Sequence, residues 1–232
     1  MACKGRRTPL GFKIQKEEIQ MRNLKRALSL ALAAIMLIGM MVVSASATGL
    51  DDFSDKDKVV NKDAVSMLVS LGIIEGKPDG SYGPTENVDR AQMAKMLSVI
   101  MNKGVDNSAL YQSVNSGLTD ITSHWAKGHI NYCYTTGIIA GRGNGKFDPA
   151  ATVTGNEAAK MLLVAAGYDA QLEGLTGNDW AIKTASLAST LGIFDDLTAP
   201  TGDPLTRDNA ALLIYNALDI EMIQKYDNGY AI

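Results

Sequence analysis

The feature that most constrains this chain is that it repeats itself. Residues 72–97 read GIIEGKPDGSYGPTENVDRAQMAKML, and residues 137–162, 65 positions later without a gap, read GIIAGRGNGKFDPAATVTGNEAAKML. A more divergent third copy follows at a shift of 55, where VTGNEAAKML aligns with LTRDNAALLI after a deletion of three residues. A unit of about fifty residues buries too little apolar surface to be stable alone. The repeat therefore predicts three copies of one unit that share a core.

Each copy predicts two helices joined by a turn-rich loop. In the first copy, apolar residues recur at helical spacing before Gly72, and EGKPDGSYGP then supplies turn residues. The second helix of each unit is expected to begin after Asp89, Thr154 and Thr206, which are good N-caps. Thr154 and Glu157 also have the spacing of a capping box. The predicted fold is mainly α, with three helix-loop-helix repeats packed as a pseudo-threefold helical bundle.

The alignment also sets the expected domain boundaries. The first repeat is placed at 51–104, the second at 117–168 and the divergent third at 172–220. Residues 221–232 form a tail that ends without a helix cap or a charged end. This ending is compatible with a truncated gene or a fragment of a longer protein, and the sequence leaves the choice open.

Residues 21–47 have the three parts of a secretory signal peptide. Basic residues precede the uncharged run LSLALAAIMLIGMMVV, and Ala45-Ser46-Ala47 follows it. The run is shorter than the about 20 residues that a bilayer span needs. Because small residues also occupy both positions that the signal peptidase inspects, cleavage after Ala47 is favoured over an uncleaved anchor. Residues 1–20 are polar and carry an acidic pair before the basic region. We interpret them as an untranslated upstream extension, with translation starting at Met21.

Removal of residues 1–47 changes the charge of the chain. It takes away eight of the 22 basic residues and two of the 25 acidic ones, which leaves 14 basic and 23 acidic residues and a net charge near −9. Such a chain is not expected to bind nucleic acid, because phosphate binding needs clustered Lys and Arg. One cysteine, Cys133, then remains, so no internal disulfide can form. A secreted protein without a stable membrane span is favoured.

The order of the motifs resembles the S-layer homology domain. The second copy carries the pattern most fully, in Asp120, Trp125-Ala126, the GIIAG of 137–141, Phe147-Asp148-Pro149 and the helix start at 154–157. The resemblance covers about 51–220. It implies a spindle of helices that anchors surface proteins, without catalysis, to the wall of a Gram-positive-type bacterium. The implied ligand is a secondary cell-wall polysaccharide, often with pyruvylated sugars, that binds in grooves between repeats.

Arg90 and Arg207 occupy the first position of their predicted helices. A cation there faces the positive end of the helix dipole, which is unfavourable unless an anion binds beside it. Free N–H groups and a guanidinium can together bind a carboxylate such as that of a pyruvyl group. The alternative is that each arginine pairs with a surface carboxylate. The second repeat has Gly155 here, so its site is expected to be weak, and Gly155→Arg is expected to restore it.

Trp125 and Trp180 are predicted to begin the first helix of repeats two and three. An indole there can form a stacking wall for a sugar or part of the core, and the sequence leaves both roles open. The first repeat has Val60 at this position, so three equal sites are not expected.

Asp55 and Asp120 hold equivalent positions in repeats one and two, and the third repeat has Leu175 there. Their carboxylates can accept hydrogen bonds from sugar hydroxyls. They can equally cap the first helix of each repeat, which is the interpretation we favour.

No metal, cofactor or catalytic site is predicted. The glycine-rich loops have too few carboxylates for an EF-hand, and His124 and His129 are five residues apart, off the spacing that brings two ligands together. Cys133 aligns with Leu68 and Ala188, which indicates a small buried position and not a nucleophile. The leading interpretation is a non-catalytic module that binds wall polysaccharide. Two alternatives stay open: the anchoring fragment of a longer surface enzyme, or a structural surface-layer protein with protein partners.

Overall fold

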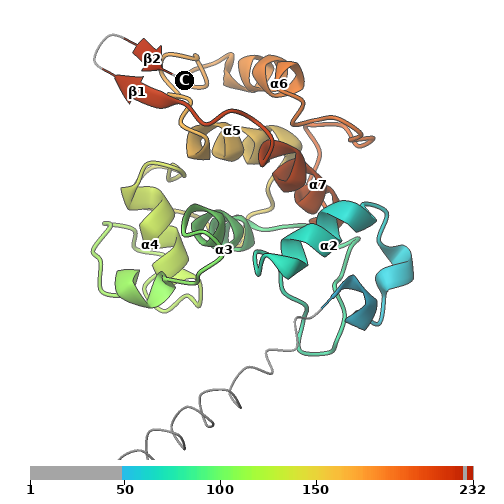
Figure 1. Ribbon diagram of the computed structural model, residues 1–232. Coiled ribbons are helices and arrows are strands. Elements are labelled where there is room, and N and C mark those ends of the chain that lie inside the picture. Colours follow the sequence, from blue (N-terminus) through green and yellow to red (C-terminus); the bar gives the residue numbers. More distant parts are fainter. Residues whose placement is uncertain (1–48, 227–228, 232) are drawn as a thin grey trace, which may run out of the picture. The chain divides into compact units, whose positions relative to one another are not determined.

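A computed structural model describes residues 49–226 and 229–231 of the chain. The signal peptide predicted at 21–47 and the extension predicted at 1–20 lie outside the described residues. The described part is mainly helical, as the repeat predicts (Figure 1). Its six α-helices are α2 (Lys62–Ser70), α3 (Arg90–Met101), α4 (Lys127–Thr135), α5 (Gly155–Ala165), α6 (Trp180–Thr190) and α7 (Arg207–Ala217).

Shorter elements complete the described chain. They are the 3-10 helices η1 (Leu50–Asp52), η2 (Lys56–Lys58) and η3 (Ser108–Tyr111), and the antiparallel strands β1 (Gln224–Tyr226) and β2 (Gly229–Ala231). No secondary structure was predicted for the tail that forms this hairpin. The tail is tied to the end of α5, because the N–H of Ile223 donates to the carbonyl of Ala166 at 2.9 Å.

The helices pair between repeats. The second helix of each repeat packs against the first helix of the next one: α3 against α4, α5 against α6, and α7 back against α2 (Figure 1). In addition, α5 contacts both α3 and α7. The pairing of α7 with α2 closes the series, so the three repeats form one bundle and share one core.

A ring of three backbone hydrogen bonds marks the pseudo-threefold axis. The N–H of Val88 donates to the carbonyl of Leu205 at 2.9 Å, Leu205 to Val153 at 2.8 Å, and Val153 to Val88 at 3.0 Å. These three residues immediately precede the caps of α3, α7 and α5, and their side chains are buried. Each backbone group is satisfied only when the other two repeats are present, which links the start of all three helices.

The caps form where the sequence predicts them. The Asp89 carboxylate accepts from the N–H of Gln92 at 2.7 Å, and the Thr206 hydroxyl accepts from the N–H of Asn209 at 3.2 Å. Thr154 and Glu157 make the complete capping box: the Glu157 N–H donates to the Thr154 hydroxyl at 3.3 Å, and the Thr154 N–H donates to the Glu157 carboxylate at 3.0 Å. These bonds occupy N–H groups that a helix start otherwise leaves without partners.

The core contains the aromatic residues of the repeated loops. Tyr82 and Phe147, which the alignment pairs, are both fully buried. Cys133 is also buried, with its Sγ atom 3.4 Å from the carbonyl oxygen of Ala94. Burial raises the pKa of the Cys133 thiol to about 12, so it stays protonated and unreactive at neutral pH.

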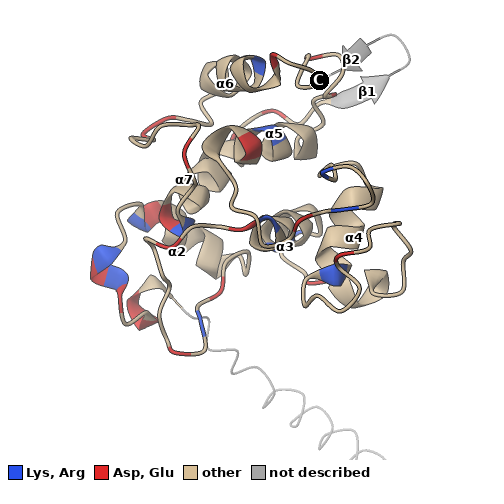
Figure 2. Cartoon of the chain, turned by 180° about the vertical axis from the view of Figure 1, so that it is seen from behind, with Lys and Arg blue, Asp and Glu red and all other residues tan. Residues whose placement is uncertain are grey.

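Charged residues are distributed over many elements. Figure 2 shows basic positions on α2, α3, α4, α5 and α6, with acidic positions among them, and not gathered on one helix. Residues 49–226 and 229–231 contain no helix of the length and apolarity that a bilayer span requires.

Candidate functional site

The first of two similar surface grooves, called groove 1 here, is built from all three repeats. It has a volume of about 700 Å³, open solvent included. Most of the residues that line it come from the loop and helix α3 of repeat one. Trp125 of repeat two and Arg207 of repeat three complete it. The charged residues that line it are Glu75, Lys77, Lys95 and Arg207.

The second groove, groove 2, has the same construction one repeat further on. Its volume is about 600 Å³, open solvent included. The loop and helix α5 come from repeat two, Trp180 comes from repeat three, and Arg90 comes from repeat one. The charged residues that line it are Arg90, Arg142, Glu157 and Lys160.

The two grooves place the same chemistry at equivalent positions. Each has a tryptophan, Trp125 or Trp180, and a lysine on the second helix, Lys95 or Lys160. A second basic residue from the loop, Lys77 or Arg142, and an arginine from the preceding repeat complete each set. The third equivalent position lacks this set, because Val60, Leu212 and Gly155 stand where the tryptophan, lysine and arginine would be.

Four lining residues were not predicted as site residues: Lys95, Lys160, Lys77 and Arg142. A signal for the first two was present, since Lys95-Met96-Leu97 aligns with Lys160-Met161-Leu162. The same lysine, placed directly before Met-Leu in both helices, marks a shared polar position on the helix face.

The side chain of Arg90 does not extend into solvent, where it could bind an anion. Its side chain is buried, at 4% exposure. Its Nε donates to the carbonyl of Phe147 at 2.9 Å, its Nη2 donates to the carbonyl of Ala140 at 2.7 Å, and the guanidinium lies 4.4 Å above the Phe147 ring. Burial, and secondly the neighbouring Arg142, lower the pKa of Arg90 to about 10, so it remains charged at neutral pH.

Arg207 repeats this arrangement on the loop of repeat one. Its Nε donates to the carbonyl of Tyr82 at 2.9 Å, and its Nη2 donates to the carbonyl of Glu75 at 3.1 Å. Its guanidinium lies 5.0 Å from the centre of the Tyr82 ring. Both arginines therefore join one repeat to the loop of the next. Each lines a groove, but its hydrogen bonds are made to the loop carbonyls. The alternative of pairing with a surface carboxylate is not observed, because no ion pair of either arginine is found among the described residues.

The expected free N–H groups beside these arginines are also absent from α3 and α7. The N–H of Arg90 donates to Ala151 at 3.0 Å, and the N–H of Ala91 donates to Pro149 at 3.0 Å. In α7, the N–H of Arg207 donates to Glu86 at 2.8 Å, and that of Asp208 to Pro84 at 3.1 Å. The loop of the next repeat thus satisfies the helix start, so the expectation of an anion held by free N–H groups there is wrong.

Gly155 has a different role from the one expected. A Cβ atom at this position would lie 2.9 Å from the carbonyl oxygen of Thr201 and 3.0 Å from its Cα, both in the backbone of repeat three. A side chain here forces the backbone to move, so Gly155→Arg cannot simply restore a binding site. Arg90 and Arg207 each line the groove of the following repeat. An arginine at position 155 would therefore line the third equivalent position, and its absence does not affect groove 2.

Asp55 and Asp120 hold loops in place. Asp55 accepts from the N–H groups of Tyr82 at 2.7 Å and Gly83 at 2.9 Å, and Asp120 accepts from Phe147 at 3.0 Å and Asp148 at 2.8 Å. Burial works to raise the pKa of each carboxyl, but these donated hydrogen bonds hold it below its ordinary value.

The favoured interpretation of these two residues as caps of the first helices is therefore wrong. The residues at the N-cap positions of α2 and α4 are Asn61 and Ala126. Neither aspartate lines groove 1 or groove 2, so the geometry does not place them against a ligand in either groove.

The two tryptophans are not equivalent in exposure. Trp125 is 57% exposed, so it is not a core residue, and its ring leans against His124 and His129 with centroids 5.6 and 6.4 Å away. Trp180 is half-buried, and the Lys160 ammonium lies 5.2 Å from its ring centre. Trp180 begins α6 as predicted, whereas Trp125 precedes the first residue of α4 by two positions.

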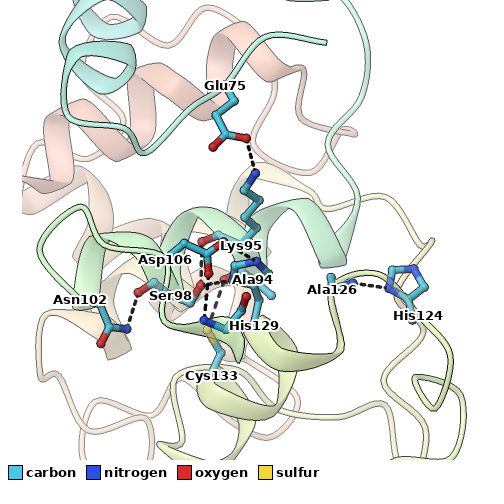
Figure 3. Close-up of polar contacts among 11 residues, drawn as sticks. Glu75, Ala94, Lys95, Ser98, Asn102, Asp106, His124, Ala126, His129 and Cys133 are labelled. Atoms are coloured by element: carbon cyan, nitrogen blue, oxygen red, sulfur yellow. Dashed lines mark hydrogen bonds and ion pairs between the residues drawn. The ribbon is translucent and has the colours of Figure 1, made fainter. Parts of the chain in front are cut away.

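Ser98 of α3, His129 of α4 and Asp106 lie close together (Figure 3). The Ser98 Oγ lies 2.7 Å from His129 Nδ1, and His129 Nε2 lies 3.7 Å from the Asp106 carboxylate. Ser98 and His129 are both buried, so this contact joins α3 to α4 and is not open to a substrate. Among the described residues, no group of three or more His, Cys, Asp or Glu side chains is arranged to hold a metal ion.

The buried His129 is expected to make stability depend on pH. Burial lowers its pKa from the ordinary 6.5, while Asp106 opposes and Lys95 reinforces this shift. The unfolded chain therefore binds a proton more readily, and the free energy of unfolding should decrease as pH falls below about 6.5. Urea unfolding at about pH 7.5 and about pH 5.5 should show a smaller decrease for His129→Gln than for the wild type. His124→Gln is the control. An equal effect of both substitutions would show that a group other than His129 causes the pH dependence of stability.

The comparisons with known proteins agree with this architecture. The S-layer homology domain matches residues 52–94 and 117–159, which lie in repeats one and two. The chain is 30% identical over 211 residues to the "Cell surface protein" of Thermoanaerobacter kivui, an alignment that covers 90% of this chain and 26% of that protein. It is 27% identical to the "Middle cell wall protein" of Brevibacillus brevis over 89% of this chain and 18% of that protein.

Enzymes are also among the relatives. The chain is 28% identical to "Exoglucanase XynX" of Acetivibrio thermocellus, over 68% of this chain and 15% of that protein. The chain thus spans about a quarter or less of the length of these curated relatives. Two matched repeats, relatives at the cell surface and a helical bundle of three related units agree with one another. The chain therefore belongs to the S-layer homology domain family and is a protein of the cell wall and cell surface.

Proposed function

We propose that this chain anchors its protein to the cell wall by binding an acidic, pyruvylated wall polysaccharide in grooves 1 and 2. The observation that carries the proposal is the duplicated set of tryptophan, helix lysine and loop cation in two quasi-equivalent grooves. Residues that served only to pack the bundle would be expected at all three equivalent positions. The third position has none of them.

Each part of the set suits one feature of such a ligand. The exposed face of Trp125 offers a flat apolar surface on which the C–H face of a sugar ring can lie. Lys95 and Lys160, on the second helices, supply cations that can bind the carboxylate of a pyruvyl group. Arg90 and Arg207 support the loops that form the groove walls, so their contribution to binding is mainly indirect.

We further propose that the module binds without catalysing a reaction. The nucleophile candidates Ser98 and Cys133 are buried, and Cys133 is held protonated by its raised pKa. The relatives named as an amidase and an exoglucanase are several times longer than the region they share with this chain. Anchoring of a longer surface enzyme, or of a structural protein such as the S-layer relatives, is compatible with the same grooves. Surface-protein partners are part of this proposal.

The double variant Lys95→Ala/Lys160→Ala tests the proposal. We expect its binding to purified walls in a sedimentation assay to fall at least about tenfold, because one charge-assisted contact is lost from each groove. The matched control is Lys58→Ala/Lys62→Ala, which removes two lysines that do not line either groove. Thermal unfolding of both variants checks that the fold is retained.

The ligand is tested separately from the residues. Walls from which the polysaccharide has been chemically removed should no longer bind the wild type. Retained binding to stripped walls would favour a protein partner, and wild-type binding by the double variant would remove the grooves from the mechanism.

A further inference from the structure

The two grooves differ at one position that faces the helix lysine. In the repeated motif G-I-I-x-G, the residue x is Glu75 in groove 1 and Ala140 in groove 2. Both residues are exposed, and both offer their backbone carbonyl to an arginine of the preceding repeat. The backbone is therefore held in the same way in both grooves, and the difference lies in the side chain alone.

In groove 1 the helix lysine already has a carboxylate partner. The Lys95 Nζ donates to the Glu75 Oε2 at 2.6 Å, a contact that Figure 3 marks with a dashed line between the two side chains. The loop cation is occupied as well, because Lys77 pairs with Glu86. An incoming carboxylate must displace Glu75 from Lys95 or bind beside its negative charge, and both are unfavourable.

In groove 2 the helix lysine is left for a ligand. Lys160 makes no ion pair among the described residues, and its ammonium lies 5.2 Å from the centre of the Trp180 ring. Burial lowers the pKa of Lys160, although the nearby Glu157 opposes this. Part of the hydration of this ammonium has therefore been lost without a carboxylate in return, and a bound anion would replace it.

The acidic residue of groove 2 does not take the place of Glu75. Glu157 Oε1 pairs with the loop cation Arg142 at 2.8 Å, and its Oε2 accepts from the N–H of Thr154 in the capping box. The formal charges of the residues lining the two grooves sum to the same value, so the difference is one of position. Glu75 neutralises the helix lysine of groove 1, whereas Lys160 of groove 2 has no carboxylate partner within 49–226 and 229–231.

We propose that Glu75 and Ala140 set the charge preference of the two grooves, and that groove 2 is the stronger site for an acidic sugar. This inference rests on the proposed function, since it assigns the acidic sugar of the wall polysaccharide between grooves that bind it. Groove 1 binds the same polymer with less dependence on its carboxylates.

Exchange of the two residues tests the inference. Ala140→Glu should weaken binding to purified wall polysaccharide by about three- to tenfold, because its carboxylate would pair with Lys160. Ala140→Gln is the matched control, with the same shape and no charge, and should bind like the wild type. In groove 1, Glu75→Ala and Glu75→Gln should both strengthen binding, by about threefold. Titration calorimetry measures each affinity, and thermal unfolding confirms the fold.

A second probe separates charge from shape. It is the same polysaccharide after carbodiimide coupling of its carboxylates to ethanolamine, which makes them neutral amides. All differences between the variants should disappear with this polymer. Equal affinities of Ala140→Glu and Ala140→Gln for the acidic polymer would overturn the inference and leave the proposed function standing. A wild type that binds neither polymer would overturn the proposed function and the inference with it.

Discussion

A fragment ending at Gly104, which contains only the first repeat, is expected to show no cooperative unfolding transition. The two helices of this repeat have their main partners elsewhere, since α2 packs against α7 and α3 packs against α4. Val65, Leu68 and Leu97 are fully buried in the whole bundle, and loss of these partners would expose their side chains to water. Hydrophobic burial would then be too small to offset the conformational entropy of about fifty residues.

Specific polar contacts would be lost as well. The start of α2 is held by Asp208 of repeat three, which accepts from Asn61 Nδ2 at 2.9 Å and from the backbone N–H of Val60 at 3.3 Å. The bond that Val88 donates to Leu205 would also be missing. Circular dichroism of residues 49–104 during heating should give a gradual change, while residues 49–231 should unfold in one sharp transition. A sharp transition of the short fragment would contradict a core shared between the repeats.

The local features of the fold were predictable from the sequence. Helix periodicity, the caps at Asp89, Thr154 and Thr206, and the glycine before each loop depend on residues within a few positions of one another. The repeat predicted the number of units, because a unit of this size needs neighbouring units to bury its apolar side chains. These signals can be recognised without knowing how the units are arranged.

The arrangement of the units was not predictable in the same way. Each arginine was predicted to form a site in its own repeat, whereas Arg90 and Arg207 contact the loop of the next repeat. A linear alignment shows which residues are equivalent but not whether helices pair within a unit or between units. Asp55 and Asp120 were mistaken for helix caps for a different reason, because each binds a loop of its own repeat 27 residues further along the chain, which local sequence patterns do not show.

Prediction of the grooves required both the alignment of the repeats and the pairing of helices between repeats. Each is assembled from three repeats, so no single repeat contains a complete site. The tryptophans were recognised because they are rare and repeated, but the lysines were hidden within a helix that otherwise reads as core. Once helix pairing between repeats is known, equivalent positions identify the second groove from the first.

Arg90→Ala is expected to destabilise the bundle by about 2–4 kcal/mol. The helix dipole alone would favour removal of a cation from the start of α3, by a few tenths of a kcal/mol. That effect is outweighed here, because the substitution leaves the carbonyls of Phe147 and Ala140 without their donor and removes the guanidinium from the Phe147 ring. Groove 2 should also lose affinity for the wall, as a consequence of a displaced loop.

Two further variants serve as comparisons for Arg90→Ala. Arg90→Lys keeps the charge but cannot reach both carbonyls with one planar group, so it should recover only part of the lost stability. Arg142→Ala removes another arginine of the same groove, whose side chain is 44% exposed and which pairs with Glu157, and should cost at most about 1 kcal/mol. Urea unfolding measures all three. If Arg90→Ala unfolds at the same urea concentration as Arg142→Ala, the buried contacts of Arg90 do not hold the loop, and its position at the groove edge would need a ligand to explain it.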